Sequence, residues 1–250
     1  MTESQSVAEG AGRTGLLVLG VDTCGPTGSV ALARIGRQSQ QILTKTAWDL
    51  GQSAKILGQI TLAGRTYSAT LVAAIAELLT QNEARLADVG AIAVVHGPGS
   101  FTGVRVGLSA VKGLSEPGNT PVVAVSRLAV LAAKAGVPSA ALDAHRHEVF
   151  LRLEGPDGSS RQLLAGAEDL AQIDPAPTKA AICDDSAASL LESVWRGTEL
   201  VRTEAPTAAD AIGVCLPAIL AGEFADLVLL DGHYLRRSDA EIFGDKAERA

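Results

Sequence analysis

The chain has 250 residues, which is enough for one large domain or two small ones and enough to bury a substantial core. Apolar residues make up 47% and charged residues 20%, which excludes wholesale disorder, and the 3% of aromatic residues predicts a core of aliphatic side chains. The formal net charge of -7 argues against binding of a phosphate backbone by this chain alone, because such binding needs clustered lysine and arginine.

The cysteines and the two ends of the chain favour a cytoplasmic protein. Cys24, Cys183 and Cys215 are far apart and form no CxxC pair, which argues against a disulfide framework or a cysteine-rich zinc site. Residues 1–14 lack the features of a signal peptide, and we expect them and residues 238–250 to be disordered tails. No apolar run approaches the roughly 20 residues that cross a bilayer, so we expect no membrane contact.

Residues 15–137 are predicted to form a first lobe. Continuous apolar runs predict buried strands, and apolar residues at helical spacing predict helices. In chain order the expected elements are strands at 16–21, 29–33 and 56–62, a helix at 67–81, a strand at 91–95, a helix at 102–115 and a strand at 121–125. This order is typical of a mixed sheet of ribonuclease-H type, with a hairpin edge beside parallel strands covered by helices.

Residues 138–237 are predicted to form a second, smaller lobe. Its expected elements are strands at 140–143, 148–153 and 180–183 and a helix at 207–222. The polar stretch 36–53, between two strands of the first lobe, is interpreted as a hairpin extension or an insertion.

The glycine-rich segment 97–103, GPGSFTG, is the strongest local motif. Between a strand and a helix, such a turn lets backbone amides approach an anion at the helix N-terminus. It is neither a Walker loop nor a dinucleotide fingerprint. The structural alternative is a tight turn with Thr102 as the helix cap.

Asp22, at the end of the first strand, starts a turn that resembles the phosphate loop of actin-like ATPases. The alternative is a carboxylate that only forms the turn. If nucleotide binds, the two turns predict a weak contact through Asp22, Gly97, Gly99, Ser100 and Gly103.

The helix at 102–115 contains glycines that form a flat strip, because Gly103 and Gly107 lie four residues apart. Each interior glycine costs roughly 1 kcal/mol relative to alanine, so another backbone is expected to pack close to this strip. The residues alone leave two interpretations open, packing on the chain's own sheet and a subunit interface.

Metal binding and nucleophilic catalysis are not predicted. His145 and His147 would share one face of a strand, with Asp143 nearby, but nothing supplies a convincing further ligand set for zinc. There is no HExxH motif and no GxSxG nucleophile elbow, so a zinc peptidase and a serine hydrolase are unsupported.

Several segments together resemble the TsaB (YeaZ) family, the accessory subunits that help place threonylcarbamoyl on adenosine 37 of bacterial tRNA. The segments that carry the resemblance are 18–23, 64–68, 96–113, 121–131 and 141–144, with a thinner match at 234–236. The resemblance implies an α/β, actin-like fold of two ribonuclease-H-like lobes, the second one reduced. The catalytic relative TsaD has a His-x-x-x-His metal pair where this chain has Ser126 and Val130, and no Gly-Gly pair follows Cys183.

The resemblance therefore implies a non-catalytic scaffold that binds no cofactor, pairs with TsaD and supports recruitment of TsaE, with tRNA contacted only through the complex. The alternatives are an active actin-like ATPase or carbamoyl transferase, and a glycoprotease-like peptidase. The helices at 67–81 and 102–115 would form the TsaD contact, and in its absence a homodimer. The residues predicted for this interface are Leu71, Ile75, Leu78, Gly103, Val104, Gly107 and Val111.

Overall fold

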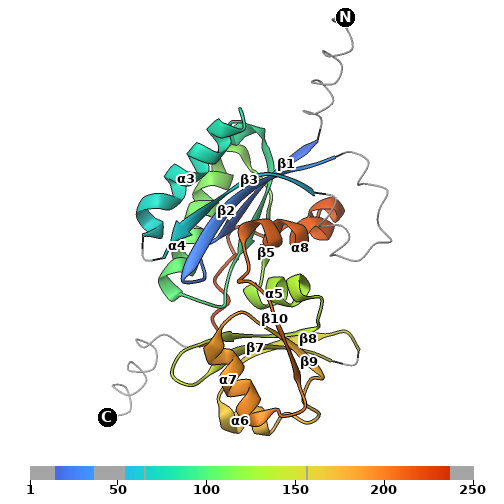
Figure 1. Ribbon diagram of the computed structural model, residues 1–250. Coiled ribbons are helices and arrows are strands. Elements are labelled where there is room, and N and C mark those ends of the chain that lie inside the picture. The colour runs from blue at the N-terminus through green and yellow to red at the C-terminus, as the bar shows by residue number, and fades with distance from the viewer. Residues whose placement is uncertain (1–14, 37–53, 65, 156, 237–250) are drawn as a thin grey trace, which may run out of the picture.

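The computed structural model describes residues 15–36, 54–64, 66–155 and 157–236. Their first sheet has the strand order β3-β2-β1-β4-β5, as Figure 1 shows. Its strands are β1 (Leu16–Asp22), β2 (Thr27–Ile35), β3 (Ala54–Ala63), β4 (Val89–Val95) and β5 (Val122–Val125). Because β1 is antiparallel to β2 and parallel to β4, a hairpin edge adjoins parallel strands, as predicted. The predicted tails and most of the predicted insertion, residues 37–53, lie outside the described residues.

The second sheet repeats this topology with the order β10-β9-β6-β7-β8. Its strands are β6 (Ser139–Asp143), β7 (Val149–Glu154), β8 (Ser160–Ala165), β9 (Lys179–Ile182) and β10 (Glu199–Arg202). The central strand of each sheet again has an antiparallel neighbour on one side and a parallel neighbour on the other. The chain therefore has two ribonuclease-H-like lobes in an actin-like fold.

Helices cover both faces of each sheet, in the layers that Figure 1 shows. On the first lobe, α3 and α4 pack on the outer face and α8 packs on the inner face. On the second sheet, α5 packs on the face toward the first lobe, and α6 and α7 cover the far face. No helix among the described residues has the length and apolar character needed to cross a membrane. The helices are α3 (Tyr67–Gln81), α4 (Phe101–Ser115), α5 (Arg127–Ala135), α6 (Ala167–Ala171), α7 (Asp185–Val194) and α8 (Ala208–Ala221).

Strand β1 is apolar on both faces because both faces are covered. Leu19 and Val21 point toward α3 and α4, and Val18 points toward α8. All three side chains have no exposed surface. Each fully buried aliphatic side chain of this size stabilises the fold by roughly 1.5–3 kcal/mol. The continuous apolar run in the sequence is therefore typical of a central strand that lies between two layers of helices.

The assignment of the last helix to the second lobe is wrong. Helix α8 packs on the inner face of the first sheet, where a Cβ on Gly20 would lie 2.5 Å from the carbonyl oxygen of Ala208. The segment after α8 also follows the first lobe, since the N–H of Ala225 donates to the carbonyl of Val122. The second lobe is smaller than predicted, because the chain crosses back to cover apolar surface on the first sheet.

Candidate functional site

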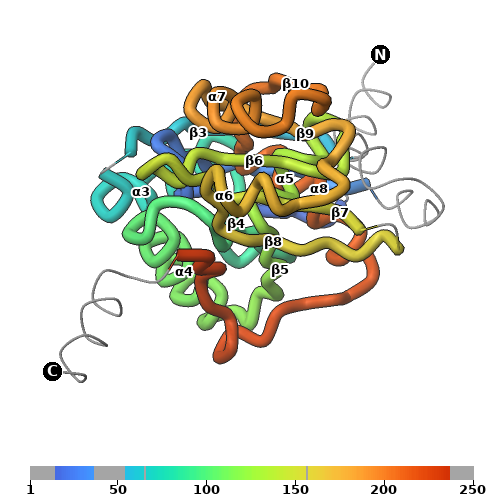
Figure 2. Tube along the Cα trace, turned by 90° about the horizontal axis from the view of Figure 1, so that it is seen from below, coloured from blue at the N-terminus to red at the C-terminus, as the bar shows by residue number. Residues whose placement is uncertain are grey.

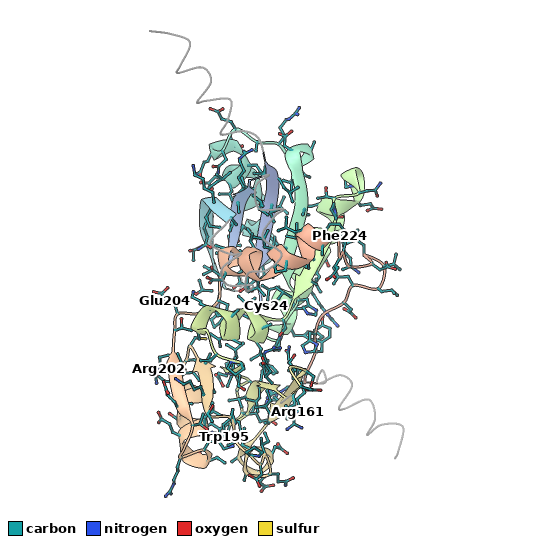
Figure 3. All side chains as sticks on the ribbon, turned by 90° about the vertical axis from the view of Figure 1, so that its right-hand side faces the viewer. Cys24, Arg161, Trp195, Arg202, Glu204 and Phe224 are labelled. Atoms are coloured by element: carbon teal, nitrogen blue, oxygen red, sulfur yellow. The ribbon has the colours of Figure 1, made fainter. Side chains whose placement is uncertain are left out.

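The turn after β1 and the glycine-rich segment after β4 lie against each other, and we call residues 22–27 and 97–103 the loop junction. The backbone N–H of Ser100 donates to the carbonyl oxygen of Cys24 at 2.7 Å. A Cβ on Gly99 would lie 2.2 Å from the same oxygen, so glycine is needed for this close approach. Figure 3 shows Cys24 where the two lobes meet.

Three backbone donors of the loop junction, the N–H groups of Cys24, Ser100 and Gly103, have acceptors within the chain. The N–H of Cys24 donates to Oδ1 of Asp22 at 2.8 Å, and the N–H of Gly103 donates to Oγ of Ser100 at 3.2 Å. Ser100, and not the predicted Thr102, is therefore the residue that caps α4. The residues predicted for a weak nucleotide contact are gathered here, but these internal bonds favour the tight-turn interpretation over an anion site.

A buried ion pair joins the loop junction to the start of α5. The Nε of Arg127 lies 3.4 Å from Oδ2 of Asp22, and the two side chains are 6% and 0% exposed. A Cβ on Gly25 would lie 2.4 Å from Nη2 of Arg127, so the guanidinium lies directly against the turn. The N–H of Arg127 also donates to the carbonyl of Gly97 at 2.7 Å. The chain's own cation therefore occupies the position beside Asp22.

The groups around this pair are held in their ordinary protonation states. Burial lowers the pKa of Arg127, but the Asp22 carboxylate and other neighbours more than compensate, so its pKa lies above the ordinary value. Burial and then the Asp22 charge raise the pKa of Cys24 well above normal and that of Tyr67 to about 12. Cys24 is therefore a neutral thiol rather than an activated nucleophile. The Tyr67 hydroxyl donates to the carbonyl of Gly25 at 2.7 Å.

Arg127 is not among the site residues predicted from the sequence. One signal for it was present, since Arg127 interrupts an otherwise apolar segment that begins a helix after a strand. A lone arginine among residues destined for the core needs a buried partner, because an unpaired buried charge is costly. The partner, Asp22, lies 105 positions earlier, so no local pattern could identify it.

Ser126 and Val130, which the sequence resemblance places where TsaD has a histidine pair, have structural roles here. The Ser126 hydroxyl donates to Oε1 of Gln162 on β8 at 2.6 Å, and Val130 is fully buried in the core. No group of three or more His, Cys, Asp or Glu side chains is arranged to hold a metal ion within the described part of the chain.

The two histidines considered as zinc ligands do not share a strand face. His145, Arg146 and His147 form the turn between β6 and β7, with φ values of 60°, 58° and 59°. The prediction of a strand start is wrong because these residues adopt the left-handed conformation instead of extended backbone. The His145 ring contacts the Asp143 carboxylate, with Nδ1 2.9 Å from Oδ2.

The residues predicted for a partner interface face the interior of the first lobe. The glycine strip approaches the turn after β1, since a Cβ on Gly107 would lie 2.3 Å from Oγ1 of Thr23 and one on Gly103 would lie 2.0 Å from the Thr23 carbonyl oxygen. The interface prediction is corrected on this point, because the apolar stripe that reveals a helix is the stripe that packs on its own sheet. The buried residues are Leu71, Ile75, Leu78, Gly103, Val104, Gly107 and Val111.

The exposed sides of the same two helices include a group of small side chains. Helices α3 and α4 pack side by side on the first sheet, as Figure 1 shows. On α3, Val72 is 58% exposed and lies among exposed alanines, and on α4 the surface includes Ser109 and Gly113. We call this surface the outer helical face. Its exposed residues are Ala69, Val72, Ala73, Ala76, Ser109 and Gly113, and its half-buried residues are Val106 and Ala110.

Comparison with protein families matches residues 56–157 to the family described as TsaD, tRNA N6-adenosine threonylcarbamoyltransferase. The chain is also similar to curated proteins that are named tRNA threonylcarbamoyladenosine biosynthesis protein TsaB. The Haemophilus influenzae protein is 38% identical over 95 residues, which cover 36% of this chain and 40% of that protein. The Bacillus subtilis protein is 30% identical over 142 residues, 55% of each chain. The chain therefore spans about two fifths to about half of the length of these curated relatives.

A solved structure supports the same relationship over more of the chain. YeaZ from Pseudomonas aeruginosa is 26% identical to this chain, with a TM-score of 0.66. The alignment covers 88% of this chain and 100% of the YeaZ chain. The similarity therefore includes both lobes and the connections between them.

Proposed function

Because the chain belongs to the TsaB (YeaZ) family, we propose that it is a scaffold subunit for the synthesis of threonylcarbamoyladenosine at position 37 of tRNA. In this proposal it acts in the cytoplasm, pairs with TsaD and supports recruitment of TsaE. It does not itself carry out the transfer, and tRNA is bound largely through the complex.

The observation that carries the non-catalytic part of the proposal is the ion pair between Asp22 and Arg127. In an actin-like phosphotransferase the turn after the first strand must offer free donors to phosphate, and an acidic side chain must be available to a metal ion. Here the carboxylate is paired and the donors of Cys24 and Ser100 are bonded within the chain. Ser126 and Val130 supply no imidazole at the positions of the TsaD metal pair.

The proposal is tested by reconstitution with purified TsaD, TsaE, a threonylcarbamoyl donor and unmodified tRNA. We expect modified adenosine to form in the presence of this chain and to fall to background when the chain is left out. The chain alone should modify no tRNA and turn over ATP negligibly. Modification of equal yield without the chain would contradict a role in the reaction.

The catalytic alternatives predict different results in the same assay. An actin-like ATPase or carbamoyl transferase would show steady turnover by the chain alone, with loss of turnover in an Asp22→Asn variant that is still folded. A glycoprotease-like peptidase would cleave glycoprotein substrates in the absence of TsaD. Either result would overturn the scaffold proposal, because the geometry around Asp22 and Cys24 supports neither.

The outer helical face is the surface that we propose for the TsaD contact. Its small side chains let a facing pair of helices approach closely, and Val72 offers an exposed aliphatic group that loses contact with water on association. The outer helical face replaces the interface predicted from the sequence. The residues of that predicted interface are buried, so they cannot contact a partner unless the core opens.

A charge at the centre of the outer helical face should abolish pairing without unfolding the chain. We expect Val72→Glu to weaken TsaD binding by at least tenfold, because an unpaired carboxylate would be buried at the interface. The measurement is isothermal titration calorimetry with TsaD, with circular dichroism to confirm folding. The matched control is Val228→Glu, the same change at a valine that is 87% exposed outside this face, which should leave binding unchanged. Undiminished binding of Val72→Glu would show that TsaD uses another surface.

A further inference from the structure

A stack of three side chains is exposed where the first lobe meets the end of the described chain. Phe101 opens α4, and Arg105 follows one turn later, with its Cζ 3.8 Å from the centre of the Phe101 ring. Tyr234 packs against the same ring, with ring centres 5.0 Å apart at 46°. Each aromatic residue is 37% exposed. Because the cation lies against the Phe101 ring, the stack presents a positive charge and aromatic surface together to solvent.

The segment that carries the tyrosine is tied to both lobes. The N–H of His233 donates to the carbonyl oxygen of His96 at 2.7 Å, and the two rings lie 5.5 Å apart. Two residues after the tyrosine, the Arg236 guanidinium bonds to Glu148, and it also donates to the His145 carbonyl at 3.4 Å. Figure 2 shows these last described residues beside α4. Hydrogen bonds on both sides of Tyr234 therefore fix the position of the stack.

The turn between β6 and β7 brings basic side chains to the same side. His145, Arg146 and His147 are exposed, although the left-handed conformation of three successive residues costs of order 1–3 kcal/mol each. The neighbouring carboxylates are paired, Asp143 with His145 and Glu148 with Arg236. His96 and His233 lie near the stack, and His145 and His147 lie in this turn, so all four histidines of the chain are in this region.

We propose that this surface, the Arg105 stack together with the β6–β7 turn, binds an unpaired stretch of RNA directly. This rests on the proposed function, which makes tRNA the substrate of the complex, and it goes beyond that function by giving this chain its own RNA contact. Unpaired bases stack on aromatic rings and on guanidinium planes, and neighbouring arginine and histidine side chains donate to phosphates. Because the whole chain has a net charge of -7, we expect RNA contact to be confined to this local surface. Among its acidic neighbours, Asp143 and Glu148 are paired and Asp231 is exposed.

The observations favour RNA over an acidic peptide. The Arg105 guanidinium lies 3.8 Å from the centre of the Phe101 ring and 6.0 Å from that of Tyr234, so the surface offers aromatic rings together with a charge. A base can stack on these rings, whereas a carboxylate would use only the charge. The basic turn is contributed by a different lobe, which suits a ligand whose bases and phosphates are recognised by separate groups.

The test uses the complex with TsaD and measures its affinity for unmodified tRNA by fluorescence anisotropy at several salt concentrations. We expect Arg105→Gln to weaken binding about tenfold and to reduce the salt dependence by about one counterion. Arg105→Lys should weaken binding while keeping the salt dependence, because it keeps the charge and loses the flat face. Tyr234→Leu should weaken binding at unchanged salt dependence. The control Arg202→Gln, on β10 at the edge of the second sheet, should change neither.

Crosslinking distinguishes direct contact from an indirect effect. With 4-thiouridine placed in unpaired regions of the tRNA, we expect a crosslink to the peptides that contain Phe101 or Tyr234. Unchanged affinity in Arg105→Gln and Tyr234→Leu, or loss of TsaD pairing in either, would overturn the proposal, the latter because the surface would then be a protein contact. If the wild-type complex does not modify tRNA, the proposed function itself fails. If the wild-type complex modifies tRNA normally and the Arg105→Gln and Tyr234→Leu variants bind tRNA with unchanged affinity, only the proposed RNA contact is overturned.

Discussion

Replacing Arg127 by methionine should destabilise the folded chain by about 3–5 kcal/mol, because it leaves the fully buried Asp22 carboxylate without its partner. A loss of this size is a large fraction of the stability of an ordinary domain. The measurement is the free energy of unfolding from urea denaturation followed by circular dichroism. Because methionine fills most of the volume of arginine, the loss of stability should come mainly from the missing charge and its hydrogen bonds and not from a cavity.

The double variant Asp22→Asn with Arg127→Met separates the ion pair from packing. Removing both charges should recover most of the lost stability, because no uncompensated charge then remains in the core. A matched control is Arg202→Met, which breaks an exposed pair with Asp185 and should change stability by less than about 1 kcal/mol. If Arg127→Met and Arg202→Met were equally stable, the buried pair would not hold the loop junction together.

Two alanine substitutions in α4 should have opposite effects on stability. Gly103→Ala places a Cβ 2.0 Å from the Thr23 carbonyl oxygen, so backbone must move, and we expect a loss of about 1–3 kcal/mol or more. Gly113→Ala meets nothing within 4 Å and should stabilise the chain by about 0.5–1 kcal/mol, since alanine loses less entropy than glycine in a helix. Thermal denaturation of both variants gives the comparison.

The opposite signs are the informative result. If Gly103→Ala were as stable as the wild type, the close approach of α4 to the turn after β1 would be wrong. The same geometry predicts the result of a bulky residue at position 107, where even a Cβ would lie 2.3 Å from Oγ1 of Thr23. A tryptophan there would collide with the Thr23 side chain and disrupt the fold, so loss of partner binding in such a variant would not identify an interface.

The sequence was sufficient to predict the elements whose apolar residues follow a clear pattern. The continuous apolar runs of β1 and β4 mark strands buried on both faces, and the helical spacing of apolar residues marks α3. Strands β8 and β10 were not predicted, because each lies at a sheet edge with mostly polar or half-exposed residues. Edge strands show little of the periodicity that sequence analysis depends on.

By itself, then, the sequence determined that Gly103 and Gly107 need a close neighbour and that Asp22 ends a strand in a turn, since both follow from local backbone chemistry. The tertiary structure alone decided that the close neighbour is Thr23 of the same chain and that Arg127 is the partner of Asp22. It also decided that α8 returns to the first sheet. Periodicity and glycine spacing show that a face must be covered, but the covering surface is chosen by contacts between residues far apart in the chain.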